Sequence, residues 1–180
     1  MGETKLMNLA KEFRHIADIE GGKFDRDEIK YYMGGGMYQI QYSYYLSIQH
    51  KEIPILFNYE MGVMASGNIY FRMPAKAKHS NFEMSVKHPI MLLLNKQIFP
   101  FKIKSKNKEL NHFIENMNTM DKLVHVIRNT PFDPIILGKV EENELVINTS
   151  FHIQFEERME IIRPMLAFYK ELIDFMYNQN

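Results

Sequence analysis

Apolar residues recur at two spacings along this chain, and the spacing changes from one segment to the next. Over residues 4–19 they recur at helical spacing, which predicts an amphipathic helix that ends at the glycines 21–22. From Tyr38 to Ile48, apolar and polar residues alternate instead. A period of two over that length predicts a long, half-buried antiparallel strand.

The residues between this helix and this strand show neither spacing. Asp25 and Asp27 predict a polar turn, and the glycines at 34–36 predict a flexible turn or bulge before the sheet. We expect residues 38–104 to be mainly strand. The shorter strands within that range are predicted at residues 53–60, 68–73, 81–86 and 98–104.

Helical spacing returns in the second half of the chain. Asn107 and Thr119 are residues of the type that caps helix N-termini, and Pro164 is tolerable near the first turn of a helix. The elements expected here are a helix pair over residues 108–128, a hairpin over residues 135–155 and a C-terminal helix over residues 160–177.

This order of elements predicts an α+β fold. Strands that follow one another closely in sequence favour hairpins and an antiparallel sheet meander. We expect the meander to be packed by the N-terminal helix, the central helix pair and the C-terminal helix. At 180 residues, the chain is near the size of one domain, so a single domain over residues 1–180 is expected.

Composition narrows the functions open to this chain. The absence of cysteine excludes disulfides, thiolate nucleophiles and thiolate metal ligands. No apolar run approaches the length of a membrane helix, and the first residues are unlike a signal peptide. The seven histidines are dispersed. We therefore expect a cytoplasmic protein with no membrane span, no metal site and no cofactor.

The net charge of zero conceals segregated charges. From Arg72 to Lys108 there are nine Lys or Arg residues and one acid, Glu83, whereas the remaining residues on both sides carry an excess of acids. A basic block of this kind can attract an anionic partner, or it can dock on the acidic half of its own chain. The sequence leaves both interpretations open.

Lysines alternate with other residues from Lys102 to Lys108, so at least the first pair should project from one face of a strand. Such a row can meet successive phosphates, but lysine on a strand edge also prevents pairing with other chains. We favour the second interpretation, because Arg72 is the only arginine of the block. The candidate binding residues are Arg72, Lys76, Lys78, Lys102, Lys104, Lys106, Lys108 and Tyr45.

A row of tyrosines is the second candidate surface. Strand alternation predicts that Tyr38, Tyr42 and Tyr44 face the core, which leaves Tyr45 and the pair at 31–32 for a partner. A catalytic alternative uses His152, which would share a strand face with Glu156 and act as a general base. No nucleophile is indicated by spacing, so we rank this alternative low.

The later elements resemble a widespread uncharacterised bacterial α+β domain. The resemblance rests on Tyr70–Pro74, Phe101–Ser105, the helix pair at 108–128, Glu144–Ile147 and the closing helix. It covers roughly residues 38–177 and implies one α+β domain without catalytic residues to transfer. The acidic residue that such domains usually carry early in the first helix of this pair would be Glu109.

Charge segregation without a catalytic constellation favours a non-enzymatic protein-binding or adaptor domain. It would recognise a protein partner through a sheet face or through the basic block at 72–108. The alternatives are a small hydrolase or transferase that uses His152 with Glu156, and binding of a nucleic-acid backbone by the basic block. A homo-oligomer is compatible with the sequence.

Overall fold

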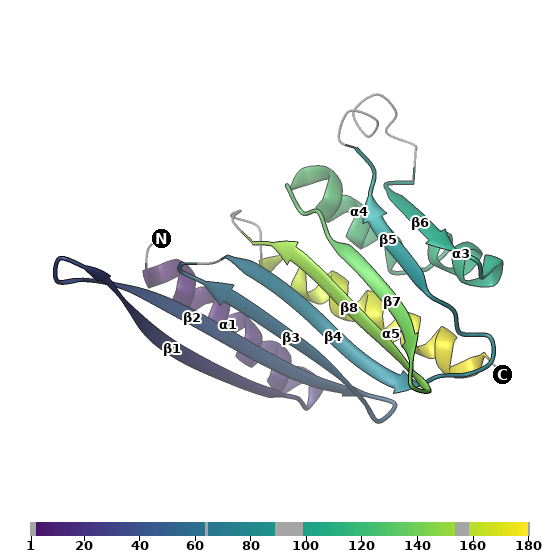
Figure 1. The fold of residues 1–180 in the computed structure, drawn as a ribbon, viewed down its shortest axis with the longest axis horizontal. Coiled ribbons are helices and arrows are strands. Elements are labelled where there is room, and N and C mark those ends of the chain that lie inside the picture. The colour runs from purple at the N-terminus through teal and green to yellow at the C-terminus, as the bar shows by residue number, and fades with distance from the viewer. Residues whose placement is uncertain (1–2, 64, 89–98, 154–158, 180) are drawn as a thin grey trace.

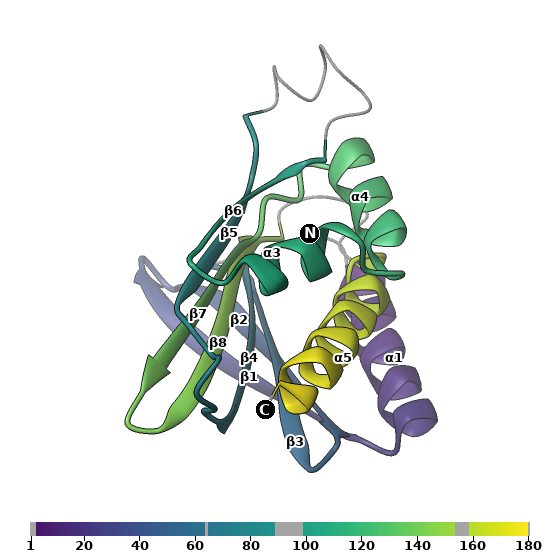
Figure 2. The same ribbon diagram turned by 90° about the vertical axis from the view of Figure 1, so that its right-hand side faces the viewer.

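The computed structural model describes residues 3–63, 65–88, 99–153 and 159–179. In these ranges the chain forms one open antiparallel sheet with helices packed on one of its faces (Figures 1 and 2). The helices are α1 (Glu3–Glu20), α3 (Lys108–Glu115), α4 (Met120–Asn129) and α5 (Ile162–Asn178). The strands are β1 (Lys23–Gly34), β2 (Met37–His50), β3 (Ile53–Met61), β4 (Ser66–Pro74), β5 (Phe82–Val86), β6 (Phe101–Ser105), β7 (Ile135–Glu141) and β8 (Glu144–His152).

Within the described ranges, the sheet has eight strands in the order β1-β2-β3-β4-β8-β7-β5-β6. Strands β1 to β4 form a meander in chain order, and β8 then pairs with β4 along its whole length, from Ser66 opposite His152 to Pro74 opposite Glu144. The two edge strands are therefore β1 and β6. The predicted α+β class, with an antiparallel meander packed by an N-terminal helix, a central helix pair and a C-terminal helix, is confirmed.

The core lies between the sheet and the helices. Phe13 of α1 packs edge to face against Tyr59 of β3, and Tyr169 of α5 packs in the same way against Phe71 of β4. All four rings are fully buried. Glu12 of α1 also accepts a hydrogen bond from an arginine of α5, which ties the two helices to one another. The aromatic residues of the sequence therefore mostly serve packing.

Two hairpins turn through pairs of residues in the left-handed region. Lys51 and Glu52 join β2 to β3 with φ values of 48° and 65°, and Glu142 and Asn143 join β7 to β8 with φ values of 47° and 69°. Positive φ at both central residues is typical of the mirror-image turn that matches the twist of antiparallel strands. These short connections set the register of both hairpins.

Two predictions about local structure are wrong. Asp25 and Asp27 do not form a turn, because β1 runs through them and pairs them with Tyr45 and Ser43 of β2. The side chain of Thr119 does not cap α4, since it makes no hydrogen bond to the first turn. Asn107 does cap α3, where its side chain accepts a hydrogen bond from the third residue of the helix.

Among the residues that the structure describes, no helix combines the length and the apolar character that crossing a membrane requires. The longest, α1, carries charged residues along its length. Pro164 lies in the first turn of α5, as predicted.

Candidate functional site

Strands β1 and β2 extend beyond the rest of the sheet as a two-stranded arm. Pairing between β2 and β3 begins at Tyr42, whereas β1 and β2 remain paired as far as Gly34 opposite Met37. Residues 29–41, which we call the arm, therefore have neighbours within their own hairpin but no third strand. Figure 1 shows the arm reaching out past the end of β3.

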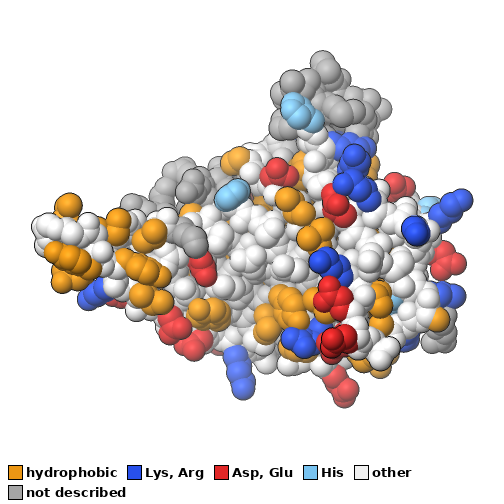
Figure 3. Space-filling model, in the orientation of Figure 1, with side chains coloured by type: hydrophobic (Ala, Val, Ile, Leu, Met, Phe, Trp, Pro, Cys, Tyr) orange, Lys and Arg blue, Asp and Glu red, His pale blue; other side chains and the backbone are white. Residues whose placement is uncertain are grey.

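The arm exposes large apolar side chains at its tip. Tyr32, Met37 and Tyr38 have 63%, 67% and 66% of their surface exposed. Ile29, Tyr31 and Met33 are also exposed. In Figure 3 hydrophobic side chains gather at this end of the molecule. Contiguous exposed apolar surface on a folded domain marks an interaction site, because water otherwise disfavours it.

The tip turns through the glycines at 34–36, whose φ values of 88°, 60° and 79° lie in the left-handed region. Glycine adopts that region without the steric cost that a Cβ atom would bring. Beside the turn, the rings of Tyr32 and Tyr38 lie 5.3 Å apart across the two strands. The glycines therefore form the hairpin turn, which sharpens the predicted turn or bulge, and the cross-strand aromatic pair supports the strands on each side.

The prediction that Tyr38, Tyr42 and Tyr44 all face the core is only partly right. Tyr44 is fully buried and Tyr42 is half-buried, but Tyr38 is exposed. The three residues do share one face of β2, as alternation requires. That face is covered by α1 near Tyr44, where Phe13 contacts the ring, and it is uncovered at the arm.

The chemistry of the arm is that of a protein interface. No charged residue occurs from Tyr31 to Gln49. Tyrosine and methionine are enriched in the buried centres of protein interfaces, and charged residues are depleted there. Surfaces that bind nucleic acid or an anionic membrane carry Lys and Arg instead. The tip of the arm therefore fits a protein surface better than a nucleic acid or an anionic membrane.

The residues of the basic block lie in three separate places. Arg72 is on β4, and its guanidinium lies 3.4 Å from the carboxylate of Glu144. Lys102 and Lys104 project from the same face of the edge strand β6, as predicted, and Lys104 pairs with Glu83 at 2.7 Å. Strands β8, β7 and β5 stand between β4 and β6. Two of the basic residues are thus matched by acids of neighbouring strands.

The loop after β4 is fastened to the end of α5. The backbone N–H of Lys76 donates to Nδ1 of His79, and Nε2 of His79 lies 3.1 Å from the carbonyl oxygen of Met176. Burial lowers the pKa of His79, which favours a neutral ring that donates at Nε2. The ammonium of Lys76 reaches the carbonyl oxygen of Tyr177. Lys78, Lys106 and Lys108 are exposed.

Tyr45 lines a hollow of about 520 Å³ on the face of the sheet that carries no helix. Its neighbours in the hollow include Leu56, Asn58 and Asn148. The side-chain oxygen of Asn58 is buried and has no hydrogen-bond partner among the described residues. The hollow combines amides with apolar surface, but its position leaves it separate from the tip of the arm.

His152 lies at the end of β8, is exposed, and stands opposite Ser66 of β4. It does not line the hollow that contains Tyr45. Glu156, its predicted partner, lies outside the described residues. No group of three or more His, Asp or Glu side chains in the described ranges is placed to hold a metal ion.

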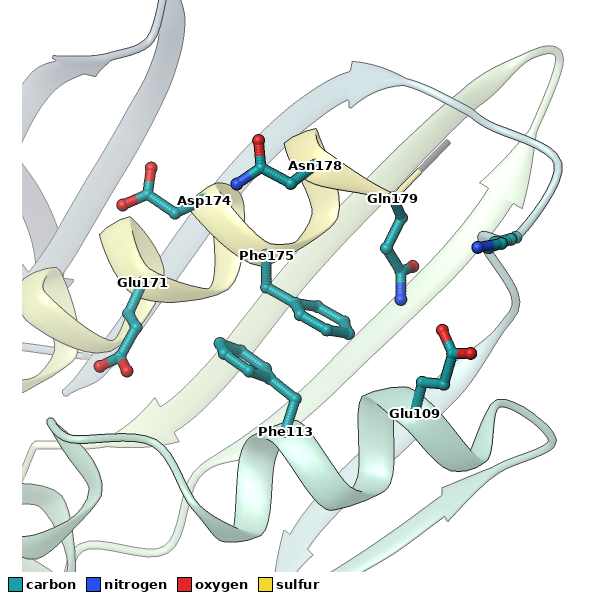
Figure 4. Close-up of a pocket in the computed structure, with 8 residues that line it drawn as sticks. Glu109, Phe113, Glu171, Asp174, Phe175, Asn178 and Gln179 are labelled. Carbon is teal, nitrogen blue, oxygen red and sulfur yellow. The ribbon is translucent and has the colours of Figure 1, made fainter.

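A second hollow, of about 430 Å³, lies between α3 and the end of α5 (Figure 4). Its floor is formed by Phe113 and Phe175, whose rings stack 4.0 Å apart. The amide of Gln179 is buried, and neither of its polar atoms has a hydrogen-bond partner among the described residues. Glu109, which the resemblance singled out, lies at its rim.

The other carboxylates of this second hollow serve the fold. Glu171 accepts hydrogen bonds from the backbone N–H groups of Asn118 and Thr119, at 3.0 and 3.1 Å. A carboxylate at this place also interacts favourably with the positive, N-terminal end of the α4 dipole. Glu171 therefore holds the two residues that precede α4, whereas the Thr119 side chain makes no capping hydrogen bond. Two of the carboxylates that line the hollow, Glu171 and Asp174, are therefore already engaged in contacts within the fold.

Asp174, on the rim of the same hollow, provides a pH-dependent contribution to stability. Partial burial raises the pKa of Asp174, but hydrogen bonds and charge from Lys51, at 2.9 Å, and His50, at 2.8 Å, outweigh it and hold the pKa below its ordinary value. A lowered pKa stabilises the folded state above the unfolded pKa, and this contribution disappears as the pH falls through the folded pKa.

We expect Asp174→Asn to lower the free energy of unfolding at neutral pH. The difference in this free energy between the variant and the native chain should become smaller as the pH falls from about 5 to about 3. Urea unfolding at a series of pH values measures this. The control is Asp133→Asn, because the carboxylate of Asp133 is exposed and does not line this hollow. A constant difference between Asp174→Asn and the native chain across that range would contradict the assignment.

Sequence reasoning named the tyrosine pair at 31–32 as a candidate surface, but it assigned Tyr38 to the core and did not single out Met33 or Met37. The signal that could have found the arm is the stretch of 19 residues from Tyr31 to Gln49 without a charge, in which tyrosine and methionine flank a glycine turn. The half of that stretch from Gln41 onward is mostly buried or half-buried, as expected for a strand with one covered face. The other half is the exposed tip, and the pattern alone does not separate the two.

Comparisons with protein-family models, with curated proteins and with solved structures gave no match to this chain. The resemblance to a bacterial α+β domain therefore stays a prediction. What defines the candidate site is the geometry of the arm.

Proposed function

We propose that this chain is a non-enzymatic protein-binding domain that holds a protein partner with the arm. The observation that supports this most directly is the exposure of Tyr32, Met37 and Tyr38 on a hairpin that extends past the sheet. An isolated two-stranded ribbon is marginally stable in water, so its persistence as exposed apolar surface favours a partner that covers it.

The partner surface should bury no unpaired charge where it meets the exposed aromatic and methionine side chains of the arm. A charged side chain buried against Tyr31 or Met33 would lose its hydration without gaining an opposite charge, because the tip carries none. The arm therefore selects against partner surfaces whose charges would be buried unpaired beneath these side chains. A cytoplasmic location, which the sequence predicts, suits such a role and stays a prediction.

Site-specific photo-cross-linking tests this function. A photoreactive phenylalanine analogue replaces Tyr38 at the tip, and the matched control places it at Tyr177, a half-exposed tyrosine at the other end of the molecule. In the cells that make this chain, we expect protein adducts at position 38 and few at position 177. The proposal is wrong if illumination yields no protein adduct specific to position 38.

The basic residues support a second function less well. Binding of a nucleic-acid backbone requires several unpaired cations on one surface, whereas Arg72 and Lys104 have acidic partners and lie on strands that are not neighbours. His152 lines neither the hollow that contains Tyr45 nor the one between α3 and α5, so neither of these supports its catalytic role. Both remain alternatives to the binding role.

A further inference from the structure

The outer side of β1 is a long strand edge. Within the described residues, β1 pairs with β2 alone, so the backbone groups along its other side have no strand beside them. β1 has 12 residues, whereas the opposite edge strand, β6, has five and carries Lys102 and Lys104. Short, lysine-bearing edges resist pairing with other chains. β1 is long enough to accept a strand.

We propose that the outer edge of β1 pairs antiparallel with β1 of a second copy of this chain, with Ile29 opposite Ile29 of the second copy. The two sheets then join edge to edge, and the two arms point in opposite directions, with the β1 strand of each arm beside residues 24–29 of the other copy. This inference rests on the proposed function, because it names a second copy as the protein that the arm binds.

Charge selects this register. In a symmetric antiparallel pair, the residue at the two-fold axis stands opposite its own copy. Asp27, Glu28 or Lys30 at the axis would place like charges directly opposite one another, which destabilises a strand pair. Ile29 is the one uncharged residue from Asp25 to Lys30. It is therefore the residue in this segment that suits the axis.

The same register gives complementary charges on both sides of the axis. With Ile29 at the centre, Glu28 stands opposite Lys30 of the second copy, and Lys30 stands opposite its Glu28. Both side chains point to the face that carries the helices, because Glu28 is opposite Tyr42 and Lys30 is opposite Ile40 on β2. Within one copy their charged atoms are 3.9 Å apart, so the four groups would form one cluster.

A hollow lies where this register needs one. Counting outward from Ile29 places Tyr32 of the second copy opposite Arg26, on the helix face of the sheet. Between α1 and β1 at this point is a hollow of about 440 Å³. It is lined by Arg14, Ala17, Asp18, Gly22, Phe24, Asp25 and Arg26.

The lining of this hollow suits a tyrosine. The guanidinium of Arg14 already lies 5.8 Å from the ring of Phe24, and a second aromatic ring beside it extends that cation–π contact. The carboxylate of Asp18 can accept the tyrosine hydroxyl hydrogen. Tyr32, 63% exposed in a single copy, would thus be covered in the pair. Each copy contributes the same surface to this pairing, so the assembly is complete with two copies.

Single-cysteine cross-linking tests the register, because the native chain contains no cysteine. Ile29→Cys places two thiols directly opposite one another at a Cα separation that a disulfide can bridge. Asp27→Cys, on the same face of the same strand, is the matched control, since each thiol would then face Tyr31 of the second copy. Mild oxidation should give a covalent dimer with Ile29→Cys and not with Asp27→Cys.

Charge reversal tests the pairing without cysteine chemistry. Glu28→Lys or Lys30→Glu alone places two pairs of like charges across the axis, and we expect each to weaken self-association about tenfold in sedimentation equilibrium. The double variant Glu28→Lys/Lys30→Glu restores opposite charges and should recover most of the affinity. A double variant as weak as the single variants would overturn the inference.

Two further results would overturn the pairing and leave the proposed function standing. One is a native chain that remains monomeric in sedimentation while photo-cross-linking at Tyr38 captures a different protein. The other is a dimer in which Ile29→Cys does not cross-link or Asp27→Cys does. Absence of any adduct at Tyr38, together with a monomeric chain, would instead remove both proposals.

Discussion

Tyr38→Asp is expected to abolish most binding by the arm while leaving the fold intact. Tyr38 is 66% exposed and its ring packs against that of Tyr32 across the hairpin, so within the described residues its replacement removes no contact of the core. In a bound arm, however, the new carboxylate would be buried against an apolar surface without a partner. Central aromatic residues of interfaces contribute about 2–4 kcal/mol, and a buried charge adds to that loss.

We expect the affinity for the cross-linked partner to fall by roughly 30-fold or more, and the free energy of unfolding to change by less than about 0.5 kcal/mol. Titration of the purified partner, or of the chain itself if the partner is a second copy, measures the first quantity. Ile135→Asp, at an exposed apolar residue of β7, is the matched control. Equal effects of the two substitutions would show that the arm has no special role.

Phe71→Ala, unlike Tyr38→Asp, is expected to cause a large loss of stability. Phe71 is fully buried in β4, stands opposite Ile147 of β8, and packs edge to face on Tyr169 of α5 with ring centres 5.5 Å apart. Its replacement by alanine removes the packing of β4 against α5, next to β8, and leaves a cavity in the core. Losses of about 3–5 kcal/mol are typical of such changes.

Urea unfolding followed by circular dichroism measures this loss. Leu56→Ala is the control, because Leu56 lies on neighbouring β3 but is 41% exposed on the face without helices. We expect the control to lose less than about 1 kcal/mol. A similar loss in both variants would mean that the β4 and α5 contact contributes little.

The strand β2 was predictable, whereas β1 was not, for one physical reason. Alternation reveals a strand when one of its faces is buried and the other is wet. In β2, Tyr44, Leu46 and Ile48 are buried and the pattern is clear. In β1 the residues after Phe24 are exposed on both faces, so no alternation was required and the charges from Asp25 to Glu28 resemble a turn.

Alternation also tells which residues share a face, but not where the cover over that face ends. Tyr38 and Tyr44 lie on the same face of β2, yet α1 covers only the second of them. The position of that boundary depends on where β3 begins to pair, at Tyr42. This is a property of the assembled sheet, and the sequence of β2 alone does not contain it.

The sequence shows that residues 72–108 carry an excess of basic residues, but it does not show that these residues lie in separate parts of the fold. Arg72 and Lys104 are 32 positions apart in sequence, and β8, β7 and β5 separate their strands because β8 returns to pair with β4. The carboxylate that holds the chain just before α4 was equally hidden, since Glu171 lies 52 residues beyond Thr119. Local patterns predicted the elements, and long-range pairing decided their neighbours.

The pairing of β4 with β8 also constrains the order in which the chain can fold during synthesis. The meander β1 to β4 is complete at Pro74, but β8 begins at Glu144, so residues 75–143 must be made first. At ribosomal rates this takes on the order of several seconds. During that time β4 is a bare edge and the faces meant for α5 are uncovered, so a chaperone that shields nascent chains should matter most in this interval.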